Sequence, residues 1–588
     1  MATDNDDTSR RFNNAVEQAV QRDPVAIPVL IDALNHELWV IRNYHAHRAL
    51  LLLGDAAVSS LLSVAQTTTI AAAVAAHTLY KIDAEAQAAT VFATLERCLD
   101  AEPAVREEAV FVLFLLGKEG SSFVPRLTAL LRDTTQTERC REGAARALQA
   151  MEALIAADAP ALLALLHANT WETRFQGGVG LETLGEAAPR PALAALVVDT
   201  SALLDARLEA IQVLGAVGGG AKALTAALRD PSAWIRLYAA RSLGKTQPRG
   251  VARALGAALD DPSVEVRRNV LWALAQLRAK SLCAAPALVE LLRDPTLGGI
   301  AAEALTKVGG RALPHLESAL LEPGIAGQRA AYALSNMRGG RRRCAQWQAE
   351  TGDTPYHPSP ADLFEAAPTI TLTPEKEAHF ATLLSVAAGG LVPFDGLYPK
   401  YEFLYWAVQR QGCVLHGSNR TNIDILRPVR KSLEAESGNP KGNINGVYAT
   451  PDEIWPLFFA TIDRGGHSVG MMNGPFETEA GKFYLFSINV ESLRAQAYTD
   501  GMVYLLPGET FENATGAERA SRVPVAPIAR LAVSPTDQPF LAQMRGFDTR
   551  NPAWPRLERF PLLDEIAKMV VRSQPEAEGN LAPRPDGG

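Results

Sequence analysis

The stretch Leu228-Arg-Asp-Pro-Ser-Ala-Trp-Ile-Arg-Leu-Tyr-Ala-Ala-Arg-Ser-Leu-Gly244 decides the fold of most of this chain, because related copies follow it. The next copy is Leu259-Asp-Asp-Pro-Ser-Val-Glu-Val-Arg-Arg-Asn-Val-Leu-Trp-Ala-Leu, and Leu292-Arg-Asp-Pro-Thr begins a third. The copies are spaced by roughly 31 to 33 residues, a period typical of stacked helical repeats. Weaker copies of the same frame run from near Asn35 to Met337, so the pattern predicts about ten units in one solenoid.

Each copy has the pattern of a helical hairpin. A leucine-rich helix ends at Asp-Pro, where the Asp side chain caps the next helix and Pro is tolerated at its first position. The second helix carries small and apolar residues three and four positions apart, such as Ala239 and Leu243, which form a stripe for the next hairpin. One hairpin cannot bury both faces, so the units stack and leave a long concave wall. We expect the arginine that recurs in the second helix, Arg236 in the first copy, on the exposed side.

The repeats resemble the short HEAT-like units of the phycobilisome-lyase class, on the two runs that begin at Asp230-Pro-Ser and Asp261-Pro-Ser. The resemblance covers more than half of the chain. It implies a solenoid but no particular activity, because this repeat type occurs in chromophore lyases, scaffolds and sensors alike. The concave wall of the solenoid itself leads us to expect a macromolecular target as partner, a protein in the first place.

The composition narrows the function classes. The chain has 588 residues, of which 47% are apolar, enough for two or more domains. Its formal net charge of −8 gives no chain-wide basic field, so nucleic acid is not the default partner, although it stays open. The five cysteines are scattered without a metal-like cluster, which fits reduced thiols and predicts no metal site. The acidic start and the absence of a long apolar run predict a cytoplasmic protein that does not contact a membrane.

The sequence predicts a change of domain after the repeats. The periodicity stops at Arg338-Gly-Gly-Arg-Arg-Arg, and the prolines that follow interrupt helices. We expect an all-α HEAT-repeat solenoid over 1–340, a linker over 341–370, an α+β domain over 371–573 and a disordered tail over 574–588. Within the α+β domain the pattern predicts helices at 374–388, 399–409 and 452–461, and strands at 412–415, 446–449, 483–490 and 502–506.

Three of these strand ends carry polar or aromatic residues that suit a ligand pocket. They are the runs His416-Gly417-Ser418, Gly446-Val-Tyr448-Ala and Asp500-Gly-Met-Val-Tyr. Taken one at a time, such residues are more often structural, but together they can deliver an imidazole, an aromatic face and a carboxylate to one cleft. His467, in a Gly-rich stretch, is consistent with either a pocket rim or a connector.

On these three runs the sequence resembles the ADP-ribosyltransferase superfamily, in the branch with a His-Tyr-acid triad. The resemblance implies that His416 bonds a ribose hydroxyl of NAD, that the Gly417 backbone meets the nicotinamide carboxamide, and that Tyr448 stacks on the nicotinamide ring. It also implies that Ser418 belongs to the NAD-binding residues. Phe458 or Phe459 would form the second aromatic wall. NAD would be a substrate rather than a resident cofactor.

Cleavage of the nicotinamide–ribose bond passes through an oxocarbenium-like state, which a carboxylate stabilises. The resemblance assigns this carboxylate to Asp500, one methylene shorter than the Glu of the common pattern. Three nearby glutamates are the alternatives: Glu477, Glu509 and Glu512.

The sequence therefore predicts an NAD-dependent ADP-ribosyltransferase whose HEAT solenoid selects or senses a macromolecular target. An NAD glycohydrolase of the same fold and a non-enzymatic HEAT-repeat scaffold are the alternatives, and the repeats alone also suggest a bilin lyase. The sequence names neither the acceptor of ADP-ribose, nor a trigger, nor the oligomeric state.

Overall fold

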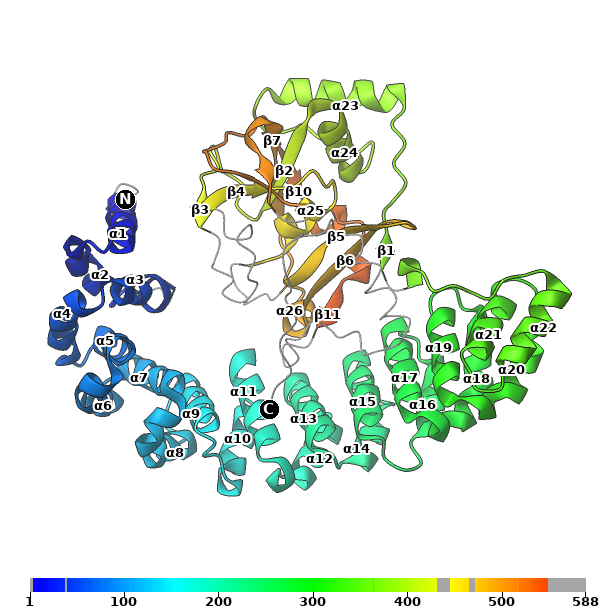
Figure 1. Ribbon diagram of the computed structural model, residues 1–588, viewed down its shortest axis with the longest axis horizontal. Coiled ribbons are helices and arrows are strands. Elements are labelled where there is room, and N and C mark those ends of the chain that lie inside the picture. Colours follow the sequence, from blue (N-terminus) through cyan, green and yellow to red (C-terminus); the bar gives the residue numbers. More distant parts are fainter. Residues whose placement is uncertain are drawn as a thin grey trace, which may run out of the picture. The chain divides into compact units, whose positions relative to one another are not determined.

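The computed structural model of the chain describes residues 4–37, 40–362, 364–430, 445–464, 471–514 and 517–547 (Figure 1). The predicted disordered tail at 574–588 and His467 lie outside these residues. The chain forms two compact units, Met1–Leu288 with Lys307–His315, and Val289–Thr306 with Leu316–Gly588. Within the described residues, no helix has both the length and the apolar character that crossing a bilayer requires.

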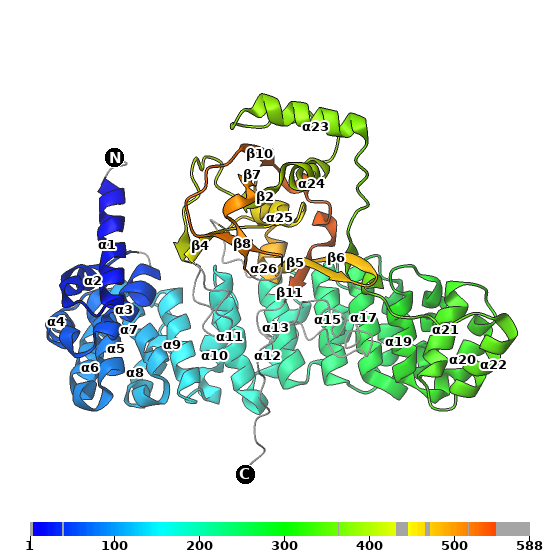
Figure 2. The ribbon, with the colours of Figure 1, turned by 45° about the horizontal axis from the view of Figure 1, so that its top comes forward.

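The first unit is a stack of helical hairpins in sequence order, as Figure 2 shows. After α1 (Asp4–Val20), the first helices of the hairpins are α2 (Ile27–Ala33), α4 (Asp55–Ala65), α6 (Ala84–Leu99), α8 (Val124–Arg132), α10 (Ala159–Leu165), α12 (Arg190–Val198), α14 (Ala221–Ala227) and α16 (Ala252–Ala257). The second helices are α3 (His47–Leu53), α5 (Ile70–Ile82), α7 (Pro103–Leu116), α9 (Glu138–Ala150), α11 (Trp171–Thr183), α13 (Leu204–Val217), α15 (Ala233–Thr246) and α17 (Val264–Leu277). From α3 to α17, each second helix contacts the next one.

Small residues let neighbouring second helices approach closely. In α15, a Cβ atom on Gly244 would lie 2.8 Å from the Cα atom of Ala273 in α17. That distance is too short for carbon atoms in contact, so glycine is required where these helices meet. The predicted solenoid of small-residue stripes is confirmed in this unit.

The recurring arginine is buried at Arg207, and the Arg236 side chain is only 13% exposed, so the expectation that it lies on the exposed side is wrong. The Arg236 guanidinium donates to both carboxylate oxygens of Asp261 in the next repeat, at 2.6 and 3.0 Å, and to the carbonyl of Asp230 at 2.9 Å. Arg207 makes the equivalent ion pair with Asp230. The carbonyl groups after the first helix of a hairpin lack partners within that helix, and the arginine satisfies them while the next Asp balances its charge.

The second unit begins with further helices and ends in an α+β region. Helices α18 (Ala285–Glu290) and α19 (Gly298–Val308) lie where the units meet in sequence, and α20 (Leu313–Leu320), α21 (Ile325–Ser335) and α22 (Arg341–Thr351) follow. Helix α22 occupies the start of the predicted linker, because its buried Cys344 and Trp347 pack it against the repeats. The domain boundaries drawn from the sequence stay predictions.

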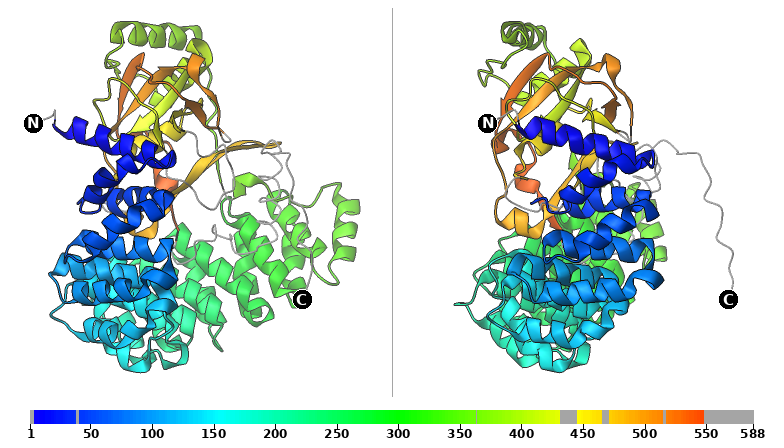
Figure 3. Two further views of the ribbon diagram at one scale, coloured as in Figure 1. Left: turned by 60° about the vertical axis from the view of Figure 1, so that its left-hand side comes forward. Right: turned by 90° about the vertical axis from the view of Figure 1, so that its left-hand side faces the viewer.

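The α+β region contains three small sheets, and Figure 3 shows its long β5–β6 ribbon. The helices are α23 (Pro374–Ala387), α24 (Lys400–Gln411), α25 (Trp455–Thr461) and α26 (Val490–Arg494). One sheet has the order β10-β7-β2, the second β3-β4-β9-β8, and the third β1-β6-β11 with β5 beside β6. The strands are β1 (Glu365–Ala366), β2 (Cys413–Ser418), β3 (Val429–Arg430), β4 (Asn445–Ala449), β5 (Met471–Thr478), β6 (Gly481–Asn489), β7 (Gly501–Pro507), β8 (Glu512–Asn513), β9 (Arg519–Ser521), β10 (Ala529–Val533) and β11 (Arg545–Phe547).

Two of these sheets join at a single bridge beside the candidate site. Leu415 of β2 and Thr450, just after β4, exchange backbone hydrogen bonds of 2.8 and 2.9 Å. Helices α23 and α24 pack on the β10-β7-β2 sheet around Phe380, Phe403 and Trp406. The three helices and four strands that the sequence predicts in this region are present, so an α+β region after the solenoid is confirmed.

Candidate functional site

Strand β2 places His416 at the junction of the two sheets. Successive side chains of a strand point to opposite faces, so Leu415 enters the core under α23 and α24 while Val414 and His416 share the other face. The His416 Nδ1–H donates to the Tyr448 carbonyl at 2.7 Å, since a carbonyl oxygen can only accept. This bond fixes the ring orientation and leaves Nε2 as an acceptor in the neutral imidazole.

The surroundings keep this imidazole neutral at ordinary pH. Burial lowers the pKa of His416, and the positive charge of Arg464 lowers it further, although the bond to the Tyr448 carbonyl acts in the opposite direction. A neutral Nε2 suits hydrogen bonding to a hydroxyl group better than it suits binding an anion. The ring therefore presents an acceptor atom at this position, and the hydroxyl-binding role of His416 stays a prediction.

Helix α25 forms the wall opposite β2, and a buried polar cluster holds its start. The Asp452 carboxylate accepts from the backbone N–H groups of Ile454 and Trp455 at 3.0 and 2.6 Å, which caps the helix. Its other oxygen lies 2.7 Å from Lys482 Nζ and accepts from the Tyr484 hydroxyl at 2.9 Å. The helix is thereby tied to strand β6.

Lys482 is the cation that balances this cluster. Its Nζ also lies 3.1 Å from a carboxylate oxygen of Glu453, so one ammonium group serves two buried carboxylates. Burial acts to lower the pKa of Lys482, but the two carboxylates outweigh it and the net effect is a raised pKa. The ammonium group stays charged and the cluster stays locked.

Gly417 is required by the approach of α25. A Cβ atom at this position would lie 2.0 Å from the Pro456 carbonyl oxygen, and a Cβ atom on Gly501 of the neighbouring strand would lie 1.9 Å from the Ala460 carbonyl oxygen. Both glycines therefore let the helix rest directly on the sheet.

A cavity of about 190 Å³ opens between β2, β4 and α25. The residues that line it include His416, Gly417, Tyr448 and Phe459, which the sequence named, together with Trp455, Arg464 and Glu518. Aromatic rings form part of its wall, with the Trp455 and Phe459 centroids 5.7 Å apart. Ligand pockets commonly measure about 300 to 1,000 Å³, so this cavity fits one end of a larger ligand.

Other residues that the sequence singled out do not line this cavity. Phe458 is fully buried and stacks on Phe486 with centroids 5.1 Å apart. Ser418 is buried, and its hydroxyl accepts from the Arg420 N–H at 3.2 Å. Asp500 is exposed, and it lies four residues along the chain from Tyr504, the residue that pairs with His416. At ordinary strand rise, four residues correspond to roughly 13 Å between the backbones of Asp500 and Tyr504.

The three alternative glutamates also lie elsewhere. Glu509 and Glu512 are exposed, and Glu512 pairs with Arg522 at 2.8 Å. Glu477 lines a second cavity, of about 680 Å³, together with Lys482 and Arg519.

Glu518 is the carboxylate that the structure brings to His416 and Tyr448. It immediately precedes β9, in which Ala520 pairs with Tyr448. The Thr450 hydroxyl donates to the Ala517 carbonyl at 3.0 Å and fixes this end of the strand. In the sequence, the only indication of this role is that Glu518 directly precedes a strand. That strand has three residues, which is too short for its pattern to be recognised from the sequence.

The cavity combines an imidazole acceptor, aromatic faces, a guanidinium and a carboxylate. The Arg464 guanidinium lies 5.9 Å from the centre of the Phe459 ring, and its Nη2 donates to the Asn419 side chain at 3.3 Å. Such a set can hold a flat aromatic ring next to a polyhydroxylated group and place a negative charge beside it.

Comparison with known proteins identifies the repeats. A family model described as HEAT repeats matches residues 221–300, so the solenoid is built of HEAT-like repeats. A comparison with curated protein sequences finds no match.

Solved structures show low similarity to the chain. The karyopherin Kap121p bound to the extreme C-terminus of the protein phosphatase Cdc14p matches with 13% identity and a TM-score of 0.36, over 56% of this chain and 43% of that one. Kap95p, in a structure with RanGDP, matches with 12% identity and a TM-score of 0.41, over 56% and 53%. The CpcE–CpcF complex of phycocyanin lyase from Nostoc sp. PCC7120 matches with 23% identity and a TM-score of 0.22, over 37% and 89%. The chain thus spans less than half the length of Kap121p.

Proposed function

We propose that this protein cleaves NAD at the cavity between β2, β4 and α25 and transfers ADP-ribose to a target selected by its HEAT-repeat solenoid. The observation that carries the proposal is the convergence of His416, Tyr448 and Glu518 on one cavity of about 190 Å³. The HEAT repeats by themselves support only a binding scaffold. The cavity and the side chains that line it are the reason to propose an enzymatic activity as well.

Each side chain has a defined task in this proposal. The nicotinamide ring enters between Tyr448 and Phe459, and His416 Nε2 accepts a hydrogen bond from a ribose hydroxyl. Glu518 replaces Asp500 as the carboxylate, because it lines the cavity and Asp500 does not. Its negative charge stabilises the positive charge that develops on the ribose as the bond to nicotinamide breaks.

The reaction balances without a further reagent. The bond between the ribose C1′ atom and the nicotinamide nitrogen breaks, and its electron pair leaves with neutral nicotinamide. A nucleophile of the acceptor bonds to C1′ and gives up its proton. If water is the nucleophile, the same site is an NAD glycohydrolase.

The test is to incubate the purified chain with NAD labelled in its adenylate part, with and without cell lysate. Nicotinamide release and the fate of the label are then measured. We expect Glu518→Gln to lower nicotinamide release at least about 100-fold, as loss of one electrostatic stabiliser commonly does, while NAD binding by calorimetry persists. The matched control is Asp500→Asn, which should retain release.

The two outcomes for the label separate the activities. Label on macromolecules indicates a transferase, and free ADP-ribose indicates a hydrolase. Absence of nicotinamide release from the unmodified chain under all these conditions, or equal release from the Glu518→Gln variant, would contradict the proposal and leave the binding scaffold.

A further inference from the structure

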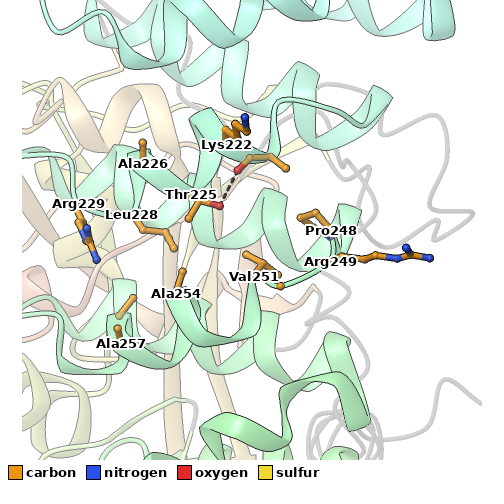
Figure 4. A pocket seen from close by; sticks show the side chains of 13 residues that line it. Lys222, Thr225, Ala226, Leu228, Arg229, Pro248, Arg249, Val251, Ala254 and Ala257 are labelled. Carbon is orange, nitrogen blue, oxygen red and sulfur yellow. Dashed lines mark hydrogen bonds between the residues drawn. The ribbon is translucent and has the colours of Figure 1, made fainter.

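The first unit contains a groove between two first helices of the solenoid, α14 and α16, which Figure 4 shows from close by. Its volume is about 530 Å³, and all of its lining residues belong to 221–258. It lies in a different unit from the cavity of the proposed NAD site, so it is a separate feature of the molecule.

One side of the groove is formed by α14 and the turn that follows it. Lys222, Thr225 and Ala226 line it from α14, at positions i, i+3 and i+4 of one helix face. Arg229 lines it from the turn, where its N–H donates to the Ala226 carbonyl at 3.0 Å. Lys222 and Arg229 therefore mark the two ends of the same wall. The Thr225 hydroxyl is already committed, since it donates to the Ala221 carbonyl at 2.7 Å.

The opposite side is built of small apolar residues. Val251, Ala254 and Ala257 of the α16 segment line it, and Leu228 lies at the α14 side. Alanines leave room along the whole groove instead of filling it. The lining contains no aromatic ring.

Three cations surround this groove without a balancing acid. Lys222, Arg229 and Arg249 are exposed, and no carboxylate is among the lining residues. Within the part of the chain that the structure describes, none of the three forms an ion pair, whereas nearby Asp230 is already paired with Arg207. The groove thus presents positive charge in a chain whose net charge is −8.

We propose that this groove binds an extended acidic peptide segment whose carboxylates are three residues apart. Lys222 and Arg229 are seven positions apart, and the turn at 228–229 continues the coil of α14, so their backbones are separated by roughly 10 Å at helical rise. In a polyproline II conformation, residues i and i+3 point to the same side and lie about 9 Å apart. Two carboxylates at this spacing therefore reach both cations of one wall, and the residues between them lie on the alanines.

The lining favours a peptide over a nucleic acid. Single-stranded nucleic acids are held by aromatic side chains that stack on bases and by basic grooves that follow the backbone. The groove has short aliphatic walls and no aromatic lining, which suits small apolar side chains better than bases.

The test uses fluorescence anisotropy of the full chain with a fluorescein-labelled peptide Pro-Pro-Glu-Pro-Pro-Glu-Pro-Pro. We expect saturable binding that weakens with added salt, and at least tenfold weaker binding of the same peptide with Gln in place of Glu. A third peptide with the two Glu residues adjacent should also bind at least tenfold more weakly.

Matched variants locate the binding. The double variant Lys222→Glu and Arg229→Glu should weaken binding at least tenfold, and the control Arg253→Glu with Lys280→Glu, which reverses two exposed charges outside the lining, should stay within twofold. Ala254→Trp fills the groove without a change of charge and should also abolish binding. The four charged positions are exposed and Ala254 is half-buried, so circular dichroism is used to show whether each variant remains folded.

Several outcomes would overturn the proposal. The first is equal binding of the Glu and Gln peptides, and the second is no saturable binding of either peptide. The third is a loss of peptide binding in the control variant that equals the loss in the Lys222→Glu and Arg229→Glu variant. Binding of a dT12 oligonucleotide that depends on Lys222 and Arg229, without binding of the peptide, would assign the groove to nucleic acid instead. None of these outcomes depends on NAD cleavage.

Discussion

A stacked pair of histidines makes the N-terminal part of the solenoid sensitive to acid. The rings of His47 in α3 and His77 in α5 lie face to face with centroids 4.6 Å apart, and both are buried. The Thr78 hydroxyl donates to the Val74 carbonyl at 2.8 Å, so it accepts from His47 Nδ1–H at 2.9 Å. His77 Nε2 is buried without a hydrogen-bond partner among the described residues.

The pKa of each imidazole is lowered in the folded chain. Burial lowers the pKa of His47 to about 4, with further contributions from the charges of Lys81 and Arg48. Burial lowers the pKa of His77 to about 3, with His47 and Lys81 adding to the effect. An exposed histidine in the unfolded chain titrates near 6.5. Between about pH 4 and 6.5 the unfolded chain therefore binds more protons, and stability falls as the pH falls.

The magnitude follows from the two pKa values. Between pH 7 and pH 5, each imidazole removes about 2 kcal/mol from the free energy of opening this region, or ~4 kcal/mol for the pair. The equilibrium for opening should then rise by a factor of several hundred, on the order of 500. Solenoid repeats open locally, so the effect should concentrate near the two histidines.

Hydrogen exchange measured by mass spectrometry tests this at both pH values, after correction for the intrinsic exchange rate. Protection in peptides from 47–53 and 70–82 should fall steeply at pH 5, while peptides from 204–217 and 233–246, which contain no histidine, serve as the internal control. The double variant His47→Leu and His77→Leu should lose this pH dependence. A parallel fall of protection in all four segments, or an unchanged pH dependence in the variant, would refute the reasoning.

Three further perturbations follow from the packing. Gly417→Ala should lower stability by about 1 to 3 kcal/mol in a denaturant titration, because α25 must move away from the sheet, and a wild-type midpoint would contradict that. Lys482→Met should cost about 3 to 5 kcal/mol at pH 8, since two buried carboxylates lose their cation, and the loss should shrink on acidification as they bind protons; a pH-independent loss would oppose this. Arg236→Ala should cost about 3 to 5 kcal/mol in thermal unfolding because the Asp261 carboxylate, only 6% exposed, loses its cation, whereas Arg268→Ala, with an exposed partner, should cost below about 1 kcal/mol. Equal losses of stability in the Arg236→Ala and Arg268→Ala variants would contradict the prediction for Arg236.

The sequence predicted the solenoid because its determinants are local. The spacing of Ala239 and Leu243 and the Asp-Pro turn at Asp230 are set within one repeat. The copies at Asp261 and Asp294 contain the same Asp-Pro turn. The ion pair of Arg236 was not predictable in the same way, because its carboxylate partner lies in the following repeat. Amphipathic periodicity assigns a long charged side chain to the exposed face and does not anticipate such a pair.

The same limit explains the carboxylate of the candidate site. His416 and Tyr448 were visible because each follows a recognisable apolar strand. Glu518 reaches them through the pairing of β4 with β9, two short strands about 70 residues apart, and this pairing has no signature in either segment. Proximity to a strong strand pattern made Asp500 the natural choice from sequence, but Asp500 lies just before β7, four positions from the residue that pairs with His416.

The structure also shows that Gly417 is not evidence for a ligand site. In the sequence, a glycine after His416 indicates space for a ligand against the backbone. The contact with the Pro456 carbonyl shows that the packing of α25 alone demands glycine here, so this residue would be needed with or without a ligand. The case for NAD chemistry therefore rests on His416, Tyr448 and Glu518, which come from three strands or strand ends and line one cavity. For that reason the Glu518→Gln variant discriminates between catalyst and scaffold, whereas a substitution at Gly417 reports on folding alone.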